Sequence, residues 1–361
     1  MLTRMPILDR ARLQAPPLDS FSLRRREFLR LIPAGLVAWP WNHLLAQGGI
    51  PQGEPGPYRV RPVTAAWTDQ KRQRTLPVKL YIPQLEDASA QAPVTVFSHG
   101  LGGSRDGGAL WGAHWASHGY LSLHLQHPGS DEALWRGGIT GNASLRESMR
   151  QGISIKTALD RVADVHFAVD ELTRRTQSGD PNVAMADLAR LGMSGHSYGA
   201  WTTLAIMGKA PPAAIAGNVS LEDLRFRAGI AFSPTAGRSQ SRDSVSRMTR
   251  PLLAVTGTRD GDVIGTGATP ERRRQSFERL PPPDKYLLVL DGADHMVFNG
   301  GAHQPPFGGL SRAEILRIDT AVKAATLVFW NAYLRDDAAA KAWLHDGVRA
   351  TLASGDAWET K

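Results

Sequence analysis

Apolar residues along this chain fall into short bursts, and longer stretches with helical periodicity separate many of them. Segments 58–69 and 74–83 alternate apolar with polar or smaller residues, as at Val78, Leu80 and Ile82, which predicts an antiparallel pair of strands. The later bursts are apolar throughout, as is typical of parallel strands buried on both faces. These later bursts span residues 92–100, 120–129, 189–193, 227–234, 251–260 and 285–295.

Helices are predicted between these strands. Residues 145–175 place apolar side chains at helical spacing. Segments 106–118, 200–207 and 311–333 also suit helices. No internal repeat or long linker interrupts the pattern. We therefore expect one α/β domain over residues 57–361, a doubly wound and mostly parallel sheet with helices on both faces.

The N-terminal region has a different composition. Residues 1–46 carry seven arginines against three acidic residues, so +4 of the formal net charge of +8 lies there. In Leu23–Trp39, an arginine pair and Phe28-Leu29 precede a short apolar segment, which resembles a twin-arginine export signal. We expect residues 1–46 to be this signal, with cleavage after Ala46 and a linker over 47–56. The alternative is a basic amphipathic helix of a cytosolic enzyme.

Composition narrows the function classes. A chain that is 42% hydrophobic and 21% charged is globular. The absence of cysteine excludes disulfides, thiolate nucleophiles and cysteine metal sites. Beyond residue 46 the basic residues are scattered, so we expect no nucleic-acid partner. The apolar N-terminal segment is too short and interrupted for stable membrane insertion.

One motif interrupts the passage from a buried strand to a helix. Gly195-His196-Ser197-Tyr198-Gly199 follows the strand and precedes the helix, and it fits the G-x-S-x-G nucleophile elbow. The two glycines remove side chains that would collide in so sharp a turn and leave the Ser197 hydroxyl exposed. The pentapeptide also occurs by chance, so a nucleophilic role requires a base and an acid elsewhere.

Candidates for both partners follow later strands. Asp260 follows the apolar run 252–255, and His295 follows the run 287–290. Functional groups of an open parallel sheet gather at the carboxyl ends of its strands, where these residues are expected. The chain order serine, aspartate, histidine is that of α/β-hydrolases. Asp262 is the main competitor for the acid, with Asp291 and Asp294 as further alternatives.

From Pro57 to Tyr333 the chain therefore resembles the α/β-hydrolase superfamily. The stretches FSHGLGGSRD, HPGSD and GHSYGA are similar to its dienelactone-hydrolase-like and platelet-activating-factor-acetylhydrolase-like bacterial branch. Two features differ from that branch. Dienelactone hydrolases use an elbow cysteine, which this chain lacks. The acetylhydrolases take their aspartate from the strand after the elbow, where this chain has Ser233.

The resemblance implies a role for each residue. Ser197 would attack an ester carbonyl, His295 would accept and return the proton, and Asp260 would orient the imidazole. The oxyanion hole would combine the backbone N–H groups of Leu101 and Tyr198. This chemistry requires no cofactor and no metal.

The substrate is less well defined by the sequence. Trp111 and Trp135 are candidates for substrate binding, although aromatic residues are more often part of a core. The insertion from Gly129 to about Gly152 is long enough to cover a pocket. We expect a small-molecule ester with a short or medium acyl chain, and a periplasmic or secreted enzyme. The alternatives are an amidase, peptidase or perhydrolase with the same triad, and a secreted binding module without catalysis.

Overall fold

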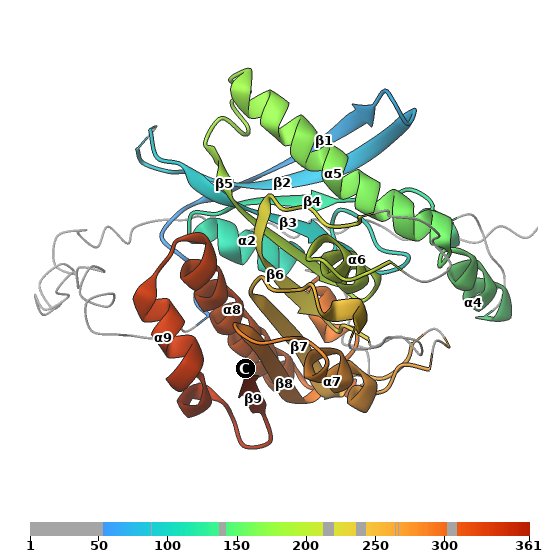
Figure 1. The fold of residues 1–361 in the computed structure, drawn as a ribbon, viewed down its shortest axis with the longest axis vertical. Helices are drawn as coiled ribbons and strands as arrows, with labels where there is room; N and C mark the ends of the chain where they lie inside the picture. The colour runs from blue at the N-terminus through green and yellow to red at the C-terminus, as the bar shows by residue number, and fades with distance from the viewer. Residues whose placement is uncertain are drawn as a thin grey trace, which may run out of the picture. The chain divides into compact units, whose positions relative to one another are not determined.

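In the described part of the chain, nine strands form one sheet in the order β1-β2-β4-β3-β5-β6-β7-β8-β9 (Figure 1). The computed structural model describes residues 53–361 except 88, 137–141, 212–219, 236–242, 264, 266 and 302–308. The predicted signal, residues 1–46, lies outside the described residues. The strands are β1 Val60–Asp69, β2 Arg74–Pro83, β3 Ala92–Ser98, β4 Leu121–Leu125, β5 Ala186–His196, β6 Phe226–Phe232, β7 Leu252–Arg259, β8 Lys285–Asp294 and β9 Ala357–Thr360.

The strand directions confirm the predicted mostly parallel sheet. The first two strands pair antiparallel, with Val78 opposite Ala65, as the alternation predicts. The pairs from β4 through β3, β5, β6 and β7 to β8 are all parallel. Their carboxyl ends therefore meet at one edge of the sheet, where an α/β protein collects its functional groups.

Helices cover both faces of the sheet, and Figure 1 shows α5 crossing β1 and β2 on the face that also carries α6. Side chains of α5 and α6 pack in one apolar core, and those of α2, α8 and α9 pack in a second. None of the helices in the described residues is long and apolar enough to span a membrane. The helices are α2 Ala109–Ser117, α3 Ala133–Arg136, α4 Asn142–Gln151, α5 Ile155–Gln177, α6 Tyr198–Ile206, α7 Pro270–Glu278, α8 Arg312–Leu334 and α9 Ala338–Asp346.

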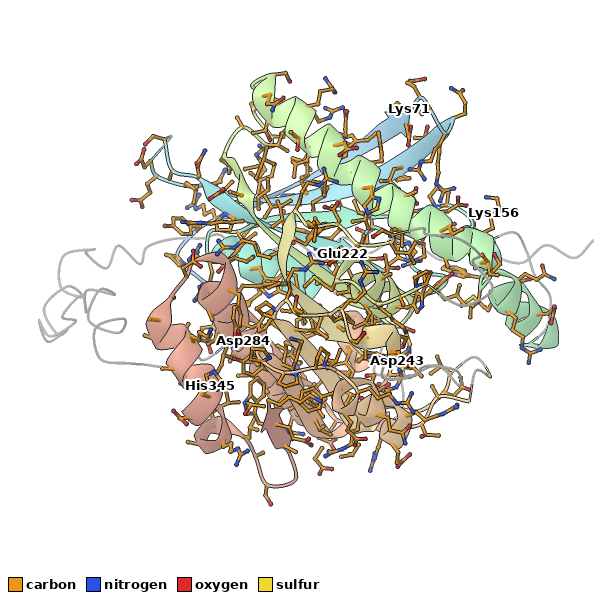
Figure 2. The ribbon with its side chains drawn as sticks, in the orientation of Figure 1. Lys71, Lys156, Glu222, Asp243, Asp284 and His345 are labelled. Carbon is orange, nitrogen blue, oxygen red and sulfur yellow. The ribbon has the colours of Figure 1, made fainter. Side chains whose placement is uncertain are left out.

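The amphipathic stretch predicted over 145–175 is two helices. Helix α4 ends at Gln151, and α5 begins three residues after Gly152. Ser154 caps α5: its hydroxyl accepts from the Thr157 N–H, and the Thr157 hydroxyl accepts from the Ser154 N–H. This capping box makes Ser154 a helix start, although the apolar periodicity continues past it. Figure 2 labels Lys156 at this junction.

Candidate active site

The strand β5 and the helix α6 meet at Ser197, at the carboxyl edge of the sheet. Ser197 has φ of 56° and ψ of −111°, a conformation that non-glycine residues rarely adopt. A Cβ on Gly199 would collide with the carbonyl oxygen of Ser98, and one on Gly195 with the backbone of Gly199. The elbow therefore requires glycine on both sides of the serine.

The three sequence-predicted residues meet at this turn. His295 Nε2 lies 3.0 Å from Ser197 Oγ, and His295 Nδ1 lies 2.8 Å from Asp260 Oδ1. The carboxylate accepts from Nδ1–H, which leaves Nε2 free to accept the Ser197 proton. Asp260 is fully buried, and its second oxygen accepts from the Thr256 hydroxyl at 2.8 Å. This arrangement can transfer a proton from a serine hydroxyl to a histidine that a buried carboxylate orients.

The other acidic candidates bind elsewhere. Asp262 accepts from the backbone N–H groups of Gly265 and Gly267. Asp294 accepts from the N–H groups of Met296 and Val297, so it stabilises a turn. The Asp291 carboxylate accepts from the Thr258 hydroxyl, and the Asp291 carbonyl accepts from Arg317.

Two backbone amides lie beside the nucleophile without an acceptor. Gly100 borders the serine so closely that a Cβ there would lie 3.4 Å from the Ser197 Cβ. Among the described residues, the amides of Leu101 and Tyr198 donate to no other group. Tyr198 is the first residue of α6, where amides lack intrahelical acceptors and the helix dipole favours negative charge. Both amides are available to an oxyanion.

A buried charged network supports the loop that carries Leu101. Arg161 is fully buried on α5 and donates to the Ser98 hydroxyl at 2.9 Å and to the carbonyl of His99. The Ser98 hydroxyl in turn donates to His127 Nε2, and His127 Nδ1–H donates to Asp164 at 3.0 Å. Helix α5 thus helps to hold the loop in place, together with the hydrogen bond from the Gly103 N–H to the Gly100 carbonyl.

Burial sets the protonation states of this network. It lowers the pKa of Arg161 to about 10 and that of His127 to about 4, so the arginine is charged and the histidine neutral at neutral pH. Burial alone would raise the pKa of Asp164, but hydrogen bonds from His127 and Arg74 lower it well below its usual value. Asp164 is therefore an anion facing the cations of α5 and β2.

Comparison with known proteins is consistent with this geometry. The family model described as "Platelet-activating factor acetylhydrolase, isoform II" matches residues 56–179, about a third of the chain. The match covers β1 to α5, with the supporting network, and ends before the elbow. The chain has the α/β-hydrolase fold. The match supports an ester hydrolase of the lipase and esterase type in general, and no curated protein matches the chain.

The described residues of the predicted insertion, 129–136 and 142–152, include side chains that pack against the loop that carries Leu101. Trp135 of α3 donates through Nε1 to the carbonyl of Gly102 at 2.7 Å, while 44% of its side chain is exposed. A Cβ on Gly102 would lie 2.7 Å from the Met149 Cε of α4. One on Gly152 would meet Leu134 and Leu101. These contacts place an apolar cover beside the elbow.

Trp111 does not belong to this cover. Its side chain is fully buried, its Nε1 donates to the carbonyl of Phe298 at 3.0 Å, and its ring stacks on Phe232. The interpretation of Trp111 as a substrate-binding residue is therefore wrong. Helix α2 packs this tryptophan into the core between the end of β6 and the turn after β8, and the sequence spacing did not show that it is buried there.

Two residues of the site were missed by the sequence analysis. Arg273 of α7 is 3% exposed and contacts both Asp260 and His295. His196 is buried in the elbow, donates through Nε2 to the carbonyl of His295 at 2.9 Å, and leaves Nδ1 without a partner. The only sequence signal for Arg273 was the run of three arginines at 272–274. The only signal for His196 was its position next to the serine in the G-x-S-x-G motif.

Proposed function

We propose that this hydrolase cleaves carboxylic esters with short or medium acyl chains through a Ser-His-Asp triad and an acyl-enzyme. The observation that carries the proposal is the position of His295 Nε2, 3.0 Å from Ser197 Oγ, with Nδ1 2.8 Å from the buried Asp260. An imidazole in this position is oriented and aligned to accept the serine proton.

The reaction follows from these contacts. Ser197 Oγ attacks the acyl carbon while its proton passes to His295 Nε2. The carbonyl oxygen becomes an oxyanion that the Leu101 and Tyr198 amides can stabilise. The imidazolium then protonates the departing alcohol, which leaves an acyl group on Ser197. Water, activated by the same histidine, releases the acid and restores the enzyme.

Two observations support a short acyl group. The apolar side chains of Leu101, Leu134, Trp135 and Met149 pack together at the loop that would hold the oxyanion, and this cover would limit the length of the acyl chain. The matching family model is named for an acetylhydrolase, an enzyme that removes a two-carbon acyl group.

The nucleophile is tested by Ser197→Ala, which should reduce kcat on p-nitrophenyl acetate by about 10⁴-fold or more, because triad residues act as a unit. It should also abolish labelling by a fluorophosphonate probe. Ser194→Ala is the matched control. Ser194 lies on β5, the strand that precedes Ser197, and its hydroxyl donates to the carbonyl of Val96. This variant should be labelled at the wild-type rate.

The outcomes separate the alternatives. A wild-type enzyme that is not labelled would point to a binding module without catalysis. Labelling without turnover across p-nitrophenyl esters from acetate to dodecanoate would point to an amidase or peptidase. Turnover that increases steadily towards dodecanoate would contradict the short acyl preference.

We also propose export through the twin-arginine route, on the strength of Arg25-Arg26 followed by Phe28-Leu29 in residues outside the described part of the chain. The exported enzyme should begin near Gln47, as measured by mass spectrometry of the periplasmic fraction. A variant with Arg25→Lys and Arg26→Lys should stay in the cytoplasm in active form. Equal export of that variant would contradict the proposal.

A further inference from the structure

Arg273 is the one charged side chain of α7 that is buried among the described residues of that helix, and its guanidinium reaches three strand ends. Its Nε lies 2.7 Å from Asp260 Oδ1 and donates to the Asp260 carbonyl at 2.7 Å. Nη1 donates to the carbonyl of Ser233 at 2.6 Å and to the Thr235 hydroxyl at 2.7 Å. Nη2 lies 3.2 Å from the Gly261 carbonyl and 3.0 Å from His295 Nδ1.

We propose that Arg273 is a positioning residue for the triad, fixing the Asp260 carboxylate and setting the proton affinity of His295. This inference rests on the proposed function, since it assigns Arg273 a role in that reaction. A carboxylate that accepts only from His295 and Thr256 could rotate, and the ionic contact with Arg273 removes this freedom.

The guanidinium also acts on His295 through its charge. Nη2 can only donate, and Nδ1 of the productive tautomer is itself a donor, so the 3.0 Å contact brings a cation against an N–H group. A cation in a buried site opposes a further positive charge beside it, so Arg273 disfavours the imidazolium relative to a neutral residue at the same position.

Charged and titratable groups from several elements face His295. Asp260 at the end of β7 favours the imidazolium, and Arg273 opposes it. His196 at the end of β5 lies with its ring centre 4.7 Å from that of His295 and is neutral, because burial lowers its pKa well below the usual value. Asp294, the residue before His295, accepts hydrogen bonds from two backbone amides. Arg273 is the cation in this set.

Removal of the Arg273 charge should shift the pH dependence of kcat/KM in one direction. In Arg273→Gln the imidazolium loses a repulsive neighbour, so the acid limb of kcat/KM should move to higher pH by about one unit. The freed carboxylate should also lower kcat, by about tenfold to a hundredfold. In Arg273→Lys the charge remains while the forked contacts are lost, so kcat should fall with the acid limb near its wild-type position.

The matched control is Arg274→Gln. Arg274 is the next residue on α7, and its guanidinium pairs with Glu359 of β9, away from the triad. This variant should keep both the wild-type kcat and the wild-type pH profile. Fluorophosphonate labelling rates across pH 5 to 9 provide a second readout of the same acid limb, independent of the ester chosen.

Titration of His295 by NMR separates this inference from the proposed function. The imidazole resonances follow the proton whether or not the protein turns over ester, so a higher His295 pKa in Arg273→Gln supports the role of Arg273 even for an inactive wild type. If Arg273→Gln does not fold, Arg273→Lys is measured instead, and a loss of kcat without a shifted acid limb supports the inference. An unshifted His295 titration in Arg273→Gln, or wild-type kcat in Arg273→Lys, would overturn it.

Discussion

Ser197 holds its backbone in a conformation that a serine adopts only when the surrounding structure enforces it. Such a conformation costs about 1 to 3 kcal/mol. Here it is enforced by the close passage of α6 over β3, where Gly199 contacts the backbone at Ser98. The strained turn is what brings the hydroxyl within 3.0 Å of His295. The backbone strain at Ser197 therefore positions the hydroxyl, and the rest of the fold offsets its cost in stability.

The identity of the acid can be tested at the same scale. Asp260→Asn should lower kcat by about 10⁴-fold, because an amide in place of the carboxylate favours the wrong histidine tautomer. Asp262→Asn should change kcat by less than about threefold, since the Asp262 carboxylate accepts from the backbone amides of Gly265 and Gly267, whereas His295 Nδ1 faces Asp260. Steady-state kinetics on p-nitrophenyl acetate measure both. A larger loss in Asp262→Asn would place the acid two residues further on.

The sequence was sufficient for some residues of the site and insufficient for others. Ser197, Asp260 and His295 each follow an apolar strand, so the rule that strand ends meet at one edge brought them together. Arg273 has no such signal, because α7 presents three consecutive arginines and only the packing of the helix decides which one is buried. Trp111 was misinterpreted for the same reason, since spacing does not give the face of a short helix.

At the scale of elements, the strands were predicted more reliably than the helices between them. Each central strand contains a short, mainly apolar run, and the structure has a strand at every one of the six bursts. Helix α7 was missed because its sequence, PERRRQSFE, buries one large apolar side chain, Phe277, and carries no apolar periodicity. Its start signal, Thr269 as N-cap followed by Pro270, was present but lacked the pattern that usually accompanies it.

Helix α5 packs against the sheet and contacts the loop that carries Leu101. Its buried Arg161 contacts the end of β3, donates to Ser130 after β4, and lies 4.5 Å from the centre of the Tyr198 ring of α6. One turn further, Asp164 accepts from two arginines of the β1–β2 hairpin, Arg72 and Arg74. The position of the loop that carries Leu101 therefore depends on contacts between several elements that are far apart in the sequence. No single stretch of sequence encodes it.

At the scale of the whole molecule, four buried histidines lie within β4 or at the carboxyl ends of β3, β4 and β5. Burial lowers the pKa of His124 and of His127 to about 4, and it lowers those of His99 and His196 well below the usual value. In the unfolded chain each of these groups titrates near its reference value of about 6.5. Between pH 6.5 and 4, the unfolded state therefore binds more protons than the folded state.

This difference sets the sign of the pH dependence. The free energy of unfolding should fall as the pH decreases from about 6.5 to 4, because each such histidine contributes up to about 1.4 kcal/mol per pH unit where only its unfolded form is protonated. Below about pH 4 the loss continues as Asp164, whose pKa is lowered in the folded state, becomes protonated first in the unfolded chain. Urea unfolding at fixed temperature across pH 4 to 8 measures this slope.

His124 offers a variant that isolates one contribution. It lies outside the triad, donates through Nδ1 to the Gly107 carbonyl at 2.8 Å and stacks on Phe97. His124→Asn should be less stable than wild type at pH 7, because a packed ring is lost. Its stability should nevertheless depend less on pH between 6.5 and 4, with a slope smaller by up to about 1.4 kcal/mol per pH unit. A variant with the wild-type slope would show that His124 is protonated equally in the folded and unfolded states, and a wild-type protein that became more stable on acidification would contradict the burial of neutral histidines as a group.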